Sequence, residues 1–96
     1  MNEVNLSNTM NSKTTKSFWK CYRSLLPEIK RRARNAYKLW RDNPSHPSLF
    51  FKRVDDSQPV YSVRIGLAHR ALGLLKGDTI MWFWIGDHKE YERMLK

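Results

Sequence analysis

The sequence predicts an α+β domain in which an N-terminal helix hairpin packs on one face of an antiparallel sheet of about four strands. Three observations predict it. Apolar residues recur with helical spacing in the first half of the chain, four short runs rich in β-branched and aromatic residues follow, and a helix-capping motif comes near the end. A chain of 96 residues has room for one domain. We place that domain at residues 13–96 and expect residues 1–12 to form a flexible tail, with Met10 as an alternative start.

Two apolar stripes predict the helices of the hairpin. The first helix is expected over residues 15–26, where the positions i, i+3, i+4 and i+7 are Phe18, Cys21, Tyr22 and Leu25. Pro27 suits the first turn of the second helix, because the N–H that proline lacks has no partner there. The stripe of that helix consists of Ile29, Ala33, Ala36, Tyr37 and Trp40, and Asp42-Asn43-Pro44 ends it.

Four runs after the prolines predict the strands, which we place at Leu49–Val54, Val60–Ile65, His69–Leu75 and Thr79–Ile85. The segments between them are short enough for hairpin connections, and they are Asp55–Pro59, Gly66–Ala68 and Lys76–Asp78. The final segment, Asp87-His88-Lys89-Glu90, has the spacing of a capping box and predicts a short helix through Leu95.

The charge of the chain is concentrated in the predicted helix hairpin. The formal net charge is +9, and residues 13–41 alone hold ten Lys or Arg against one Glu. Such a segment indicates a polyanion or an acidic protein as partner, although a basic helix face that is merely solvated would look the same. The contact residues that we expect are Lys30, Arg31, Arg34 and Lys38.

Composition excludes several classes of protein. Hydrophobic residues make up 41% of the chain, too many for a disordered chain, yet no stretch approaches the roughly 18 apolar residues of a membrane span. The one cysteine excludes an internal disulfide framework, and the N-terminus lacks the basic start and apolar middle of a signal peptide. We therefore expect a small basic protein of the cytoplasm without a membrane partner.

Counting residues across the predicted hairpins gathers the cations on one face of the sheet. Arg64 then lies opposite Arg70, Arg70 opposite Trp84, Lys52 opposite Ser62, and Phe50 opposite Arg64. Because side chains alternate between faces, one face collects Phe50, Lys52, Ser62, Arg64, Arg70, Trp82 and Trp84. The other face is apolar and forms the core under the helices, with Phe51, Tyr61, Val63, Ile65, Ala71, Gly73, Leu75, Met81, Phe83 and Ile85.

Two opposed arginines repel each other unless an anion binds between them, and a phosphate matches two guanidiniums well. The tryptophans beside them offer flat surfaces on which nucleobases stack, an interaction worth ~1–3 kcal/mol per base. The alternative is that the two arginines pair with Asp87, Glu90 or Glu92 and cover the tryptophans as a second small core.

One histidine stands out as a group that could exchange a proton. His88 opens the last helix, and Tyr91 follows at i+3 on the same helical face. For His46, between Ser45 and Pro47, we expect a structural role, and His69 beside Arg70 is ambiguous. The sequence has no metal-ligand spacing, no nucleotide-binding glycine loop and no hydrolase elbow, so we expect no metal and no cofactor. Cations, aromatics and an imidazole suit metal-free RNA cleavage, in which the ribose 2′-hydroxyl attacks its own phosphate.

Several motifs in order along the chain resemble a known family. These are Asn43-Pro44-Ser45-His46-Pro47-Ser48-Leu49, Phe51-Lys52-Arg53-Val54, Tyr61-Ser62-Val63-Arg64-Ile65-Gly66, Arg70-Ala71-Leu72-Gly73 and Trp82-Phe83-Trp84-Ile85-Gly86-Asp87-His88. Together, over residues 15–95, they resemble the RelE/ParE superfamily of bacterial type II toxin–antitoxin toxins. The resemblance implies a RelE-like α+β toxin that an acidic antitoxin neutralises by wrapping its basic surface. RelE-like members cleave mRNA, often on the ribosome, whereas ParE-like members poison DNA gyrase.

The resemblance also implies roles for individual residues. Arg64 and Arg70 take the place of phosphate-contacting arginines, and His88 and Tyr91 lie where the ribonuclease branch has catalytic residues. The RNA-binding residues would be Lys52, Arg53, Trp82 and Trp84. Our first hypothesis is therefore an endoribonuclease toxin that blocks translation. The alternatives are a gyrase inhibitor that uses the basic helix hairpin, and an inactive RNA-binding relative.

Overall fold

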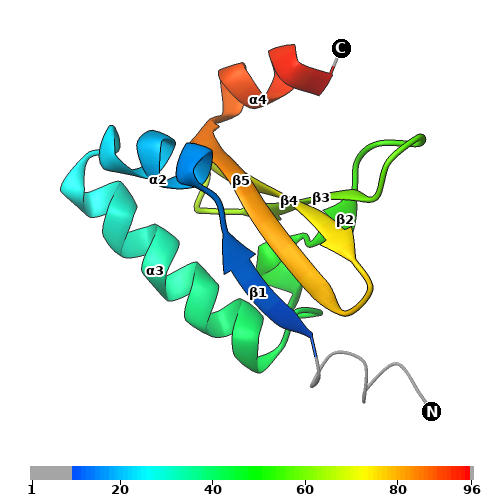
Figure 1. Cartoon of the computed structure of the whole chain (residues 1–96). Coiled ribbons are helices and arrows are strands. Elements are labelled where there is room, and N and C mark those ends of the chain that lie inside the picture. The colour runs from blue at the N-terminus through cyan, green and yellow to red at the C-terminus, as the bar shows by residue number, and fades with distance from the viewer. Residues whose placement is uncertain (1–9, 96) are drawn as a thin grey trace.

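The computed structural model describes residues 10–95. In chain order they form β1 (Asn11–Thr14), α2 (Lys16–Arg23), α3 (Pro27–Asp42), the 3₁₀ turn η1 (Pro47–Leu49), β2 (Lys52–Arg53), β3 (Val60–Arg64), β4 (His69–Lys76), β5 (Thr79–Asp87) and α4 (His88–Leu95). The strands make one sheet in the order β1-β5-β4-β3-β2. Figure 1 shows the hairpin of α2 and α3 along one side of the sheet and α4 beyond the end of β5. The predicted α+β fold is confirmed.

The helix hairpin forms where the apolar stripes predict it. Thr15 caps α2, because its hydroxyl oxygen accepts a hydrogen bond from the Phe18 N–H at 3.2 Å. The helix ends at Arg23, earlier than predicted, and Ser24 caps it. Pro27 then occupies the first turn of α3, as expected.

The main core lies between this hairpin and the sheet. Ala33 and Trp40 of α3 are buried against sheet residues that share one face, namely Val63, Ile65, Ala71, Ile80, Trp82 and Ile85. Trp40 is only 2% exposed and packs edge-on against Trp82, with ring centroids 5.4 Å apart. Burial of these aromatic rings supplies much of the driving force that holds the hairpin on the sheet.

The first strand corrects the prediction of a flexible tail over residues 1–12. Asn11 and Ser12 belong to β1, which pairs in parallel with β5 at the sheet edge. The remaining residues of that predicted tail, other than Met10, lie outside the described residues. Side chains anchor the strand, since the Ser12 and Tyr37 hydroxyls lie 3.0 Å apart and the Trp19 indole N–H donates to the Thr14 hydroxyl at 2.8 Å. The sequence of β1 has no alternation of apolar and polar residues, and its partner β5 lies almost seventy residues further along the chain. No local pattern therefore predicts this strand.

A bulge in β5 corrects the predicted register between β4 and β5. The connecting turn has two residues, Gly77 and Asp78, because Lys76 pairs with Thr79. An irregularity between Leu72 and Gly73 then absorbs one extra residue of β5. As a result Gly73 lies opposite Trp82 and Leu72 opposite Trp84, which places the two tryptophans on opposite faces. The expectation of both beside the arginines is wrong for Trp82.

The predicted strand Leu49–Val54 is mostly irregular. Leu49 ends η1 and is 2% exposed, and only Lys52 and Arg53 form β2. Between η1 and β2, Phe50 adopts the left-handed conformation at φ 45° and ψ 42°. This conformation costs a residue with a Cβ roughly 1–2 kcal/mol. Phe50 therefore cannot continue the strand, and the expected ladder partnership of Phe50 with Arg64 is absent.

Helix α4 begins as its capping motif predicts and covers part of the second face of the sheet. The Asp87 carboxylate accepts a hydrogen bond from the Glu90 N–H at 2.8 Å. On the inner side of the helix the Tyr91 hydroxyl lies 3.3 Å from the Ser62 hydroxyl of β3, and Leu72 beneath is 2% exposed. The sheet is thus sandwiched between α3 and α4. No helix of residues 10–95 has the length and apolar character needed to cross a membrane.

Candidate functional site

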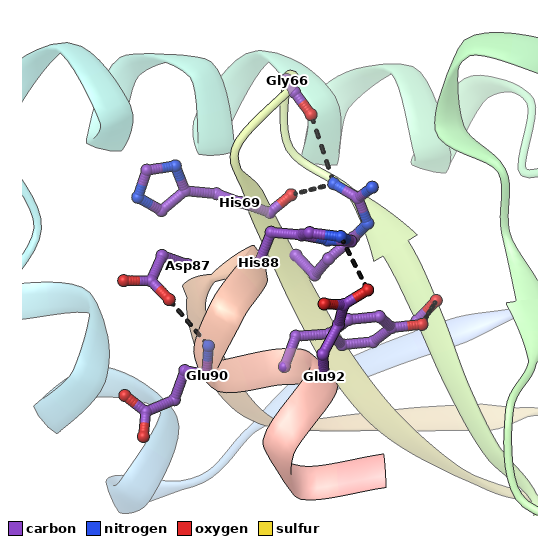
Figure 2. A network of polar contacts seen from close by, with 9 residues as sticks. Gly66, His69, Asp87, His88, Glu90 and Glu92 are labelled. Carbon is purple, nitrogen blue, oxygen red and sulfur yellow. Dashed lines mark hydrogen bonds and ion pairs between the residues drawn. The ribbon is translucent and has the colours of Figure 1, made fainter. Parts of the chain in front are cut away.

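Two opposed arginines form the centre of the candidate site, on the sheet face that α4 partly covers. Arg64 of β3 lies directly opposite Arg70 of β4, as predicted. The Arg64 Nε donates a hydrogen bond to the Gly66 carbonyl at 3.2 Å. The Nη1 of Arg70 donates to two carbonyls, that of His69 at 2.8 Å and that of Gly66 at 3.4 Å (Figure 2). The loop after β3 thereby holds both guanidiniums in place.

The electrostatics of this pair are unfavourable without an anion. Burial lowers the pKa of Arg70, and the positive charge of Arg64 lowers it further. The carboxylates that could have neutralised the pair have other partners. Within the described part of the chain the ion pairs are His88 with Glu92 and Arg93 with Glu90, and Asp87 caps α4. Neither arginine forms an ion pair with these carboxylates within residues 10–95, although the negative charge of Glu92 partly offsets the lowering of the Arg70 pKa. The ion pairs of the alternative are thus absent from this part of the chain, while Ser62, Leu72 and Tyr91 are buried on this face.

Tyr91 is the common neighbour of the arginine and the histidine. Its ring, 8% exposed, lies 5.8 Å from the Arg70 Cζ and stacks on the His88 imidazole with centroids 5.9 Å apart. A cation over an aromatic face is stabilised by the quadrupole of the ring. Helix α4 thus brings His88 and Tyr91 to the Arg70 end of the sheet.

The two nitrogens of His88 have different environments. Nε2 lies 3.1 Å from a Glu92 carboxylate oxygen (Figure 2), and the His88 side chain is 41% exposed. Nδ1 is buried and has no hydrogen-bond partner among residues 10–95. Proton exchange with a bound molecule would therefore run through Nε2, and the molecule would have to displace the Glu92 carboxylate from this nitrogen.

Lys52 and Trp84 complete the cluster on this face. Lys52 is exposed and lies opposite Ser62, as predicted. Trp84 lies opposite Leu72 rather than Arg70. Its ring nevertheless extends over Gly86, where a Cβ would lie 2.5 Å from the Trp84 Cζ2, and Gly86 is the residue opposite Arg70. The indole therefore packs beside the arginine end of the sheet.

Two predicted RNA-binding residues lie elsewhere. Trp82 is 5% exposed in the core under α3. Arg53 lies opposite Tyr61, and its guanidinium donates to the carbonyls of Asp55 at 2.9 Å and Asp56 at 3.3 Å. It fastens the loop between β2 and β3.

The other two histidines are not part of the cluster. The His46 Nδ1 accepts a hydrogen bond from the Ser48 N–H at 3.2 Å, which agrees with the structural role expected for it. His69 lies opposite Asp87 at the end of the sheet, and Figure 2 shows its ring pointing away from the guanidinium that its carbonyl holds.

The four predicted contact residues of α3 lie on the helix-hairpin side of the sheet, whereas Arg32 of the same helix reaches Gly66, where its Nη1 would lie 3.6 Å from a Cβ. Arg34 donates to the Tyr22 hydroxyl at 3.0 Å, and the Lys30 Nζ lies 5.7 Å from the Tyr22 ring centroid. Arg31 and Lys38 are exposed. Beside them a cavity of about 480 Å³ opens between the hairpin and β1, and its lining is mostly aromatic and aliphatic, including Phe18, Trp19, Tyr22, Ala36, Tyr37 and Trp40.

Phe50 lies beside the arginine pair, as predicted, but its left-handed backbone conformation was not predicted. The Arg64 Cζ lies 5.0 Å from the Phe50 ring centroid, so the two side chains meet without a shared strand register. The Pro47-Ser48-Leu49 turn before it is the signal that could have indicated a left-handed residue at this position.

A family model described as a ParE-like toxin domain matches residues 27–93. The chain belongs to the ParE-like toxin domain family. This confirms the resemblance seen in the sequence motifs. The match to the ParE-like toxin domain begins at the first residue of α3 and takes in Lys52, Arg64, Arg70, His88 and Tyr91, whereas β1 and α2 lie outside it.

Solved structures of toxins share the fold of this ParE-like toxin domain. A chain of the RelB–RelE antitoxin–toxin complex from Methanococcus jannaschii has 19% identity to this chain and a TM-score of 0.70. The match covers 88% of this chain and 99% of that chain. YafQ from E. coli has 10% identity, a TM-score of 0.68, and coverage of 85% and 97%. The RelBE2 toxin–antitoxin complex from Mycobacterium tuberculosis has 14% identity and a TM-score of 0.66, and the match covers 83% of this chain and 99% of that chain. None of the curated proteins matches the chain.

Proposed function

We propose that this protein is the toxin of a type II toxin–antitoxin system and that it acts as a metal-free endoribonuclease on mRNA. The observation that carries the proposal is the opposed pair Arg64 and Arg70, which has no carboxylate partner within residues 10–95 and lies beside the aromatic ring of Tyr91. Two fixed guanidiniums on a basic domain suit a phosphate of the RNA backbone.

The chemistry follows from where charge develops. The ribose 2′-oxygen forms a bond to the adjacent phosphorus while the bond to the 5′-oxygen breaks, which leaves a 2′,3′-cyclic phosphate and a 5′-hydroxyl. Negative charge accumulates on the phosphate oxygens in the transition state, and Arg64 and Arg70 would stabilise it there. His88 would accept the proton of the 2′-hydroxyl and donate a proton to the 5′-oxygen through Nε2, once the RNA has displaced the Glu92 carboxylate from this nitrogen. Tyr91 would keep the imidazole and the Arg70 guanidinium in position, and Lys52 would bind a neighbouring phosphate.

The test compares single substitutions in a cleavage assay on purified mRNA, with and without ribosomes. We expect Arg64→Ala, Arg70→Ala and His88→Ala each to slow cleavage by about 100- to 1,000-fold, because each removes a group that acts on the reacting atoms. Arg93→Ala is the matched control, since Arg93 is exposed and pairs only with Glu90. If cleavage survives in an Arg64→Ala, His88→Ala double variant, the proposal is wrong.

Mapping RNA 5′ ends after induced expression in cells separates the two alternative functions. The gyrase hypothesis draws on the basic surface of α3, which lies across the sheet from the arginine pair. Accumulated DNA breaks with intact transcripts would support that hypothesis and contradict the ribonuclease. An inactive RNA-binding relative would produce no growth defect at all.

An acidic antitoxin is the protein partner that we propose. The support comes from two features of α3, a row of cations and an adjacent cavity of about 480 Å³ with an apolar lining. A partner segment that alternates acidic and apolar side chains would satisfy both. Two of the similar toxins were solved as complexes with an antitoxin, which is consistent with such a partner.

A further inference from the structure

Phe50 has a conformation and an exposure that stability does not explain. It is 55% exposed and adopts the left-handed backbone conformation at φ 45°, which favours glycine or asparagine. The left-handed backbone caps η1, but this role does not require a large apolar side chain that stays half in water. Residues in this state gather at functional sites, where the surrounding structure maintains them.

The aromatic ring of Phe50 lies next to a guanidinium that can bind a phosphate. The Arg64 guanidinium contacts its ring, with Cζ 5.0 Å from the centroid, and Arg70 lies opposite Arg64 on the next strand. A shallow groove of about 450 Å³ extends from this ring over Leu49 and Leu39 toward Leu67. Leu67 itself is 81% exposed. An occupant of this groove would meet apolar side chains on its floor and one positive charge at its edge.

We propose that Phe50, Arg64 and the groove beside them bind an unpaired nucleobase of single-stranded RNA. The base stacks on the free part of the Phe50 ring, and the phosphate of the same nucleotide pairs with the Arg64 guanidinium. The proposal rests on the proposed function, because it extends the phosphate site of Arg64 and Arg70 by one nucleotide. It assigns to Phe50 the selection of single-stranded over paired RNA, since a base within a duplex has no free face to offer.

A nucleobase fits this site better than a peptide does. Aromatic stacking beside a guanidinium is the general way in which proteins bind single-stranded nucleic acid. A peptide could use the leucines of the groove, but a flat aromatic ring in direct contact with a guanidinium matches a base and its phosphate more closely. The groove volume lies within the range of about 300–1,000 Å³ typical of small-ligand sites.

The test measures binding of uncleavable oligonucleotides to the full chain. The probes are a fluorescent 2′-O-methyl oligoadenylate hexamer and an abasic sugar–phosphate hexamer of the same charge. We expect Phe50→Ala to weaken binding of the adenylate about tenfold or more, the effect of one lost stack, and to leave binding of the abasic probe unchanged. Phe50→Trp should retain tight binding of the adenylate. Leu26→Ala is the control for loss of an exposed apolar side chain, because Leu26 is 63% exposed and lies outside the groove.

The outcomes separate this proposal from the ribonuclease proposal. Equal affinity of the parent chain for both probes, or an equal effect of Phe50→Ala on both, overturns the nucleobase site even if the chain cleaves RNA. Loss of antitoxin binding in Phe50→Ala without loss of adenylate binding also overturns it, because Phe50 would then be a protein contact. A base-dependent effect of Phe50 in a chain that cleaves no RNA supports the site and contradicts the ribonuclease. Thermal unfolding of each variant verifies the fold.

Discussion

Arg64 and Arg70 keep two positive charges close together at the cost of stability. Like charges directly opposite each other on neighbouring strands destabilise a sheet by roughly 0.2–1 kcal/mol. The lowered pKa of Arg70 has the same origin, in its burial and in the charge of Arg64. A stability cost that an anion would relieve is typical of a binding site, because selection for function tolerates it.

Salt should therefore stabilise the parent chain more than a variant without the opposed pair. In Arg64→Gln the gain in unfolding free energy between about 50 mM and about 500 mM NaCl should be smaller, since there is less repulsion left to screen. Urea unfolding at the two concentrations measures it. Arg93→Gln removes an exposed charge elsewhere and should respond to salt as the parent does. An equal response of Arg64→Gln and the parent would show that the repulsion is negligible.

Single positions differ in how well the sequence predicts them. The Arg64–Arg70 register was predictable because the loop between β3 and β4 is short and its hairpin is regular. The face on which Trp82 lies was not predictable, because one extra residue in β5 places the side chains on its two sides out of the simple alternation. For Phe50 the sequence predicted the arginine neighbour but not the backbone, since an aromatic side chain favours a strand while the turn before it favours a left-handed residue.

The elements themselves follow local signals where those signals exist. Helices α2, α3 and α4 begin at a threonine cap, a proline and an aspartate cap, all of which are visible in the sequence. Strand β1 has no such signal. Its hydroxyl-bearing side chains matter only because Tyr37 and Trp19 lie within reach in the folded chain.

Helix α4 should depend on its cap for both its stability and its role in the site. Asp87→Ala removes the acceptor for the Glu90 N–H and should lower stability by about 1 kcal/mol. It should also slow RNA cleavage, because His88 and Tyr91 belong to the first turn and rely on its geometry. Circular dichroism on heating and the cleavage assay measure the two effects. Lys89→Ala, an exposed position in the same turn, is the control, and equal behaviour of the two variants would contradict the expectation.

Seen as one molecule, the protein has two basic surfaces on opposite sides of its sheet. The α3 surface holds Arg31 and Lys38, and the α4 side holds Lys52 beside the arginine pair. The separation means that an acidic partner and an RNA need not compete for the same cations.

Substitutions on the two surfaces should separate the two kinds of binding. Arg31→Gln with Lys38→Gln should slow association with the antitoxin about three- to tenfold at low salt, because exposed charges act mainly on the rate of encounter, and should leave RNA cleavage intact. Lys52→Gln should weaken RNA binding and leave the antitoxin unaffected. Surface plasmon resonance and the cleavage assay provide the measurements. Loss of both activities in either variant would show that the surfaces are one.

The spacing within β5 can change at the bulge without altering either face of the sheet. Removing Phe83 would straighten the strand and leave Trp82 opposite Gly73, Trp84 opposite Leu72 and Gly86 opposite Arg70. A deletion elsewhere in the strand would instead turn side chains on one side of it to the other face. The Asp55–Pro59 loop, by contrast, can lengthen or shorten without altering any pleat. Homologous chains should therefore differ by insertions and deletions in that loop, and those that lack the residue between Trp82 and Trp84 should have a regular β5.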